Sequence, residues 1–123
     1  MRRAQQRYEA STAAAQKARR FVNRVLTHWD RGDVREDANL LTSEIVADAV
    51  RQQSSQVTLL IEQADGVVRV EVSDDPGLIM DPKAAAFERR TGRRLVHALA
   101  RRWGSDTDLY RTATWFELPR RRD

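Results

Sequence analysis

Apolar residues recur at helical spacing in two stretches of the first half of the chain. In residues 11–29 they stand three and four positions apart, which is typical of a helix with one buried face. Ser11 or Thr12 is the expected N-cap of this helix, and Gly32 is its expected stop. A capping-box pattern then opens a second periodic stretch, over residues 33–51. The sequence therefore predicts two successive amphipathic helices.

Two strand-like runs follow and are separated by a hairpin signal. Residues 57–61 and 67–72 are rich in valine, leucine and isoleucine, and the second run alternates apolar with charged side chains. Asp65 and Gly66 between them are typical of a two-residue hairpin turn. We therefore expect an antiparallel pair of strands with one apolar face.

The last third of the chain is predicted to contribute a long connection, one helix and two strands. Residues 76–92 show little periodicity, and connections of this length are usually lids or binding segments. A third helix is expected over 93–103, followed by strands near 107–111 and 112–118. This order predicts an α+β fold, a two-layer sandwich with the helices on one face of a mostly antiparallel sheet.

Length and composition set the class of protein. A chain of 123 residues makes one domain, residues 1–123, with a core at about 11–118 and short basic tails. The absence of cysteine excludes disulfides and thiolate metal sites. The chain has no apolar run near the ~20 residues of a membrane span, and no apolar stretch follows its basic N-terminus as in a secretory signal. We therefore expect a cytoplasmic protein, and Met1 favours a self-contained chain over a fragment of a multidomain sensor.

The net charge of +4 is concentrated near the two ends of the sequence. Removing Arg2, Arg3 and the three arginines of 120–122 from the 22 basic residues, and Asp123 from the 18 acidic ones, leaves 17 of each. A nucleic-acid-binding domain normally carries positive charge on its folded body. Nucleic acid is therefore not an expected partner.

Glu44 and Asp48 are the first candidate for chemistry. They stand four residues apart, so they share one face of the second helix, where two like charges repel. Mg²⁺ prefers carboxylate oxygens, and a bound cation would turn this repulsion into attraction. The alternative is a solvated pair in which Arg51 neutralises Asp48.

Two further candidates lie at predicted element ends. Asp74 follows a strand and could accept a hydrogen bond from a ligand amine, although aspartate there is also typical of a capped turn. Gly92 precedes the third helix beside Arg93 and Arg94, and a helix N-terminus suits phosphate. The alternatives are a solvated basic face or a site for an acidic partner.

The order of these features resembles that of a known family. The stretches concerned are Leu-Thr-Ser-Glu-Ile-Val-Ala-Asp-Ala-Val-Arg at 41–51, Val-Glu-Val-Ser-Asp-Asp at 70–75, Gly-Arg-Arg-Leu at 92–95 and Trp-Phe-Glu-Leu at 115–118. Over about residues 11–118 the chain resembles the anti-sigma-factor serine kinases, which are histidine-kinase-like ATPase domains of the GHKL superfamily with the Bergerat fold. The resemblance implies binding of ATP and Mg²⁺.

The resemblance also implies roles for individual residues. Glu44 matches the general base, Asp74 the aspartate that recognises adenine, Gly77 the first glycine box and Gly92 the start of the phosphate lid. The family transfers the γ-phosphoryl group of ATP to a STAS-domain antagonist of an anti-sigma factor. It also sequesters a sigma factor, usually as a homodimer.

The chain departs from the family pattern at three places around this pocket. Asp48 stands where the family has the Mg²⁺-binding asparagine, and Arg94 replaces the second lid glycine after Arg93. The Gly-x-Thr of the last strand is absent, although a one-residue shift brings Thr114 or Thr112 into the role of the threonine. We therefore expect a regulatory ATP-binding switch and leave kinase activity open. The alternative is a non-catalytic interaction module with a vestigial nucleotide pocket.

Overall fold

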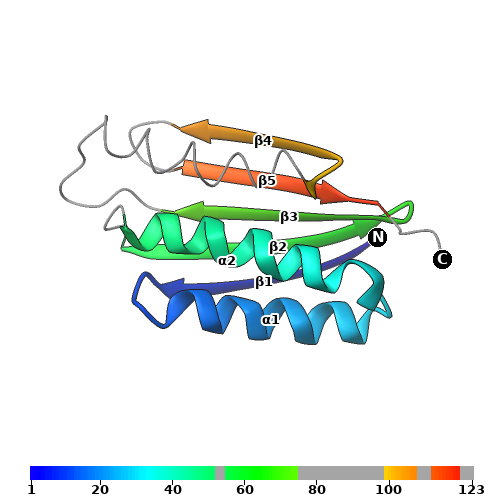
Figure 1. The fold of residues 1–123 in the computed structure, drawn as a ribbon, viewed down its shortest axis with the longest axis horizontal. Coiled ribbons are helices and arrows are strands. Elements are labelled where there is room, and N and C mark those ends of the chain that lie inside the picture. The colour runs from blue at the N-terminus through cyan, green and yellow to red at the C-terminus, as the bar shows by residue number, and fades with distance from the viewer. Residues whose placement is uncertain (52–54, 75–98, 108–111, 120–123) are drawn as a thin grey trace.

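The computed structural model describes residues 1–51, 55–74, 99–107 and 112–119 (Figure 1). Its elements are β1 (Arg2–Glu9), α1 (Ala14–His28), the 3₁₀ turn η1 (Gly32–Val34), α2 (Arg35–Arg51), β2 (Gln56–Ala64), β3 (Val67–Asp74), β4 (Arg102–Thr107) and β5 (Thr112–Leu118). The strands form one antiparallel sheet in the order β1-β2-β3-β5-β4. In Figure 1, α1 and α2 run side by side against this sheet. The predicted α+β fold is confirmed.

The core lies between the two helices and the sheet. Because side chains alternate across a strand, Val68, Val70 and Val72 all point to the helix-covered face of β3, and all are buried. On the neighbouring strands β2 and β5, the buried residues of the same layer are Val57, Leu59, Ile61, Phe116 and Leu118. None of the helices in the described ranges is long and apolar enough to cross a membrane.

The basic N-terminal segment is a strand and not a tail. β1 pairs along its whole length with β2, and the Arg2 Nη1 donates a hydrogen bond to the Trp29 carbonyl oxygen at 3.1 Å. Its sequence lacks an apolar run because an edge strand buries little, and only Ala4 and Tyr8 are half-buried. Regular secondary structure therefore begins at Arg2, before residue 11.

The first helix starts and stops at other residues than predicted. Its N-cap is Ala13, and the hydroxyl of Ser11 accepts a hydrogen bond from the Ala13 N–H at 3.3 Å instead of capping the helix. At the other end Asp30, and not Gly32, takes the left-handed conformation, with φ 56°. Gly32 begins η1, which leads directly into α2.

The hairpin and the last strand agree with the predictions. Asp65 and Gly66 have φ of 53° and 78° between the paired residues Ala64 and Val67, as in a type I′ turn. β5 covers the predicted 112–118. The predicted connection 76–92 lies outside the described residues, as does most of the third helix.

β4 is where the prediction was wrong. Arg102 and Trp103, expected at the end of the third helix, belong to this strand, which begins five residues before the predicted one. Gly104, the expected helix stop, faces Trp115 across the sheet, and a Cβ at Gly104 would lie 2.6 Å from the Trp115 Nε1. The glycine leaves room for the indole ring, which lies on the sheet face without helices rather than in the core.

Candidate functional site

Four of the eight predicted site residues lie in described elements at one end of the molecule. Glu44 and Asp48 are on α2, Asp74 ends β3, and Thr114 is on β5. α2 packs against β3, and the end of β3 pairs with the start of β5 (Figure 1). The other four, Gly77, Gly92, Arg93 and Arg94, lie outside the described residues.

Asp74 is a buried carboxylate on the helix-covered face of the sheet. It continues the alternation of the buried valines of β3, and 9% of its surface is exposed. It pairs with Val57 of β2 on one side and with Thr112 of β5 on the other. A carboxylate in such a place is stable only where donors or cations meet it, so Asp74 is suited to hold a hydrogen-bond donor.

Thr112 and Thr114 place two hydroxyl groups on the same sheet face as Asp74. Thr112 lies opposite Asp74, and Thr114 lies opposite Val72. On its other side Thr114 faces Ser105, and the two hydroxyl oxygens are 3.2 Å apart. Sequence reasoning did not find Ser105, because the strand that carries it was expected further along the chain.

The carboxylate of Asp48 is held by a cation from its own helix. It is 7% exposed and forms an ion pair with the Arg51 guanidinium one turn later. The Arg51 contact agrees with the alternative interpretation, although Asp48 is buried and not solvated as that interpretation expected. Glu44 lies one turn before Asp48 and is partly exposed.

The described residues offer few metal ligands. They contain no group of three or more histidine, aspartate or glutamate side chains that could hold a metal ion. Mg²⁺ bound with a nucleotide usually takes only one or two carboxylates, and phosphate and water supply the other oxygens. Asp48 and Glu44 fit that sparse arrangement, with Arg51 competing for Asp48.

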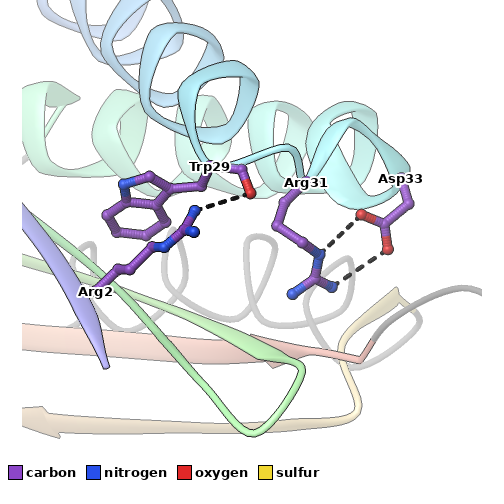
Figure 2. Close-up of polar contacts among 4 residues, drawn as sticks. All are labelled: Arg2, Trp29, Arg31 and Asp33. Carbon is purple, nitrogen blue, oxygen red and sulfur yellow. Dashed lines mark hydrogen bonds and ion pairs between the residues drawn. The ribbon is translucent and has the colours of Figure 1, made fainter.

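The position of α2 is fixed at the opposite end of the molecule by a buried arginine. Arg31 is 1% exposed, and its Nε and Nη2 donate to the two carboxylate oxygens of Asp33 at 2.9 and 3.2 Å (Figure 2). Figure 2 also shows Arg2 reaching the Trp29 carbonyl oxygen beside this turn. The Arg31–Asp33 pair braces the turn between α1 and α2 internally, and the Arg2 hydrogen bond ties the end of α1 to β1.

The chain is similar to a sensor kinase over half of its length. It is 36% identical over 64 residues to the sensor protein kinase CarS of Pseudomonas aeruginosa, a stretch that covers 51% of this chain and 14% of that protein. No family model matches the chain. The chain spans far less than two thirds of this relative. The similarity is therefore confined to half of this chain and to a small part of the sensor kinase.

Proposed function

We propose that the protein is a regulatory ATP-binding switch of the anti-sigma-factor kinase type. The observation that carries the proposal is the buried Asp74 at the end of β3, with Thr112 opposite it and α2 packed alongside. The carboxylate and hydroxyl groups on this sheet face suit the amine end of a ligand. The two further carboxylates on α2 suit a metal-bound anion at its other end. The similarity to a sensor kinase supports the same class.

In this proposal each residue has a separate task. Asp74 accepts a hydrogen bond from the adenine amine, and Thr112 or Thr114 supports it from β5. Asp48 contributes an oxygen to Mg²⁺, which when bound would neutralise phosphate charge. Glu44 orients the hydroxyl of a partner protein if phosphoryl transfer occurs.

The remaining parts of the proposal concern phosphates and partners. Gly77, Gly92, Arg93 and Arg94 contact the phosphates. The partners are a STAS-domain antagonist or a sigma factor, and a second copy of the chain. These parts rest on the resemblance in the sequence.

A non-catalytic interaction module is the second candidate, and one observation favours it. Arg51 already pairs with Asp48, the residue that stands where the related kinases carry their metal-binding asparagine. Mg²⁺ would have to displace this guanidinium or share the carboxylate with it. In this candidate the pocket is vestigial and protein binding is the whole function.

Thermal unfolding with and without Mg·ATP tests the proposal. Ligand at about 100 times its dissociation constant stabilises a fold by ~2.7 kcal/mol, which raises the midpoint of a domain of this size by roughly 10 °C. We expect Asp74→Asn to abolish the shift, because it removes the negative charge and one accepting oxygen and sets an NH2 donor against the adenine amine, which is itself a donor. Glu44→Ala should keep the shift and lose any phosphoryl transfer.

Asp65→Asn is the matched control. It makes the same chemical change in the β2–β3 hairpin, where asparagine also suits the turn, so the ATP shift should stay at the wild-type value. An unchanged midpoint at millimolar Mg·ATP for the wild-type chain would rule out the switch and leave the interaction module. A shift that survives Asp74→Asn would reject the assigned role of Asp74.

A further inference from the structure

One side of the molecule is strongly basic, although the chain as a whole is nearly balanced. α1 contains no acidic residue. Its cations are all exposed: Lys17, Arg19, Arg20 and Arg24. β1 adds three more exposed arginines, Arg2, Arg3 and Arg7, against the single acid Glu9. Residues 2–28 therefore carry seven basic side chains and one acidic one.

β1 and α1 are neighbours in space, so these charges line one edge of the molecule, with Arg3 and Arg7 on the sheet face away from the helices. α1 packs against β1, and the two run alongside each other in Figure 1. The Tyr8 hydroxyl of β1 donates to the Lys17 carbonyl oxygen of α1 at 3.5 Å. Burial raises the pKa of Tyr8, and Arg24 is close enough to oppose that rise. We call the seven cations together the α1–β1 surface.

The Glu62 carboxylate of β2 lies 3.6 Å from the Arg3 guanidinium, and other acids gather in a separate part of the chain. Residues 30–51, which include η1 and α2, hold six acidic and three basic side chains. A sum over the whole chain conceals the separation. Arg2 and Arg3, which were counted with the ends of the sequence, both lie within the paired strand β1.

The α1–β1 surface also includes an open edge of the sheet. β1 is the first strand in the order β1-β2-β3-β5-β4, so among the described residues only β2 pairs with it. Every second N–H and C=O of an edge strand points away from the sheet. In a strand added there, every second side chain would lie on the same sheet face as Arg3 and Arg7. The side chains between them would lie on the other face, near the α1 cations.

We propose that the α1–β1 surface binds an extended acidic segment of a partner protein, which adds to β1 as a sixth strand. The edge offers alternating donors and acceptors, which a peptide backbone matches in full, whereas a phosphodiester backbone supplies acceptors alone. The charge selects a segment with acidic residues at positions four apart, facing Arg3 and Arg7. The inference does not depend on ATP, because none of these residues belongs to the candidate nucleotide site.

Fluorescence anisotropy of a labelled peptide tests the binding. The probe is a short repeat of glutamate and threonine, added to the full-length protein without nucleotide at low salt. Arg7→Gln on β1 and Arg20→Gln on α1 should each weaken binding about two- to fivefold, and added salt should weaken it further. Arg102→Gln is the matched control, because it removes an exposed arginine from β4, the other edge strand, and should leave binding unchanged.

Amide hydrogen exchange of the same complex tests strand addition. The β1 amides that exchange rapidly in the free protein should become protected, at every second residue between Arg2 and Glu9. Binding without new protection in β1, or equal loss in all three variants, would overturn the proposal. Tighter binding of a labelled duplex DNA than of the peptide would overturn it too, as would pairing of β1 with a second copy of the chain in place of the peptide.

Discussion

At the residue scale, Asp30 determines how α1 ends. Its N–H donates to the Thr27 carbonyl oxygen at 3.1 Å, and the Arg31 N–H donates to that of Leu26 at 2.8 Å. These two bonds make a Schellman motif, in which the residue after the C-cap takes a left-handed conformation. That position usually holds glycine, and here the sequence has aspartate.

Substitution of Asp30 should therefore change stability in a direction set by the backbone. Asp30→Gly should raise the free energy of unfolding by about 0.5–1 kcal/mol, because glycine adopts positive φ without a Cβ clash. Asp30→Ala should lower it by about 1 kcal/mol, since alanine has the same Cβ clash but lacks the short polar side chain that makes positive φ tolerable for aspartate. Urea unfolding of both variants measures this, and shifts of the same sign would contradict it.

At the element scale, β4 and β5 are joined by a close approach that only glycine permits. The Trp115 ring lies against Gly104, and the Arg69 guanidinium lies 5.0 Å from the ring centroid. The indole therefore lies between Gly104, which has no side chain, and the Arg69 cation. This contact lies next to the helix-facing pair of Ser105 and Thr114 on the same two strands.

Gly104→Ala should force the indole to move. We expect a loss of about 1–3 kcal/mol in the free energy of unfolding, the usual cost of an added methyl group in a filled space, together with a change in tryptophan fluorescence. Gly32→Ala is the control, because a Cβ there meets nothing within 4 Å. Equal effects of the two substitutions would show that the Trp115 contact contributes nothing.

At the scale of the whole molecule, the composition leaves few side chains that titrate at alkaline pH. All but two of the 22 basic residues are arginine, which keeps its charge to about pH 12, and the chain has two tyrosines. The pKa of Tyr8 is raised above 10.0, mainly by burial. The unfolded chain therefore loses this proton at lower pH than the folded protein does.

The unfolding free energy should accordingly carry a contribution from Tyr8 that is complete below pH 10.0 and lost as the pH rises through the raised pKa. Tyr8→Phe should flatten the decline of the unfolding free energy that is expected between about pH 9 and 11. Because the variant also loses the hydrogen bond to Lys17, the slope against pH is the readout rather than the value at neutral pH. A slope equal to that of the wild-type chain would contradict the assignment.

The sequence by itself determined the elements whose signal is local. α1, α2, β2, β3 and β5 could each be predicted from their own residues. Asp65 and Gly66 identify the β2–β3 hairpin without knowledge of the rest of the chain. The acidic candidates on α2 and at the end of β3 were found for the same reason, since their positions follow from spacing within one element or at its end.

The tertiary structure alone decided the features that depend on remote partners. β1 is a strand because β2 offers it an edge, and β4 begins at Arg102 because its residues pair with β5. Thr112 lies beside Asp74 through a pairing of residues far apart in sequence. The basic α1–β1 surface likewise exists only when β1 is placed against α1, because net charge adds up along a chain while an electrostatic surface depends on which residues are neighbours in space.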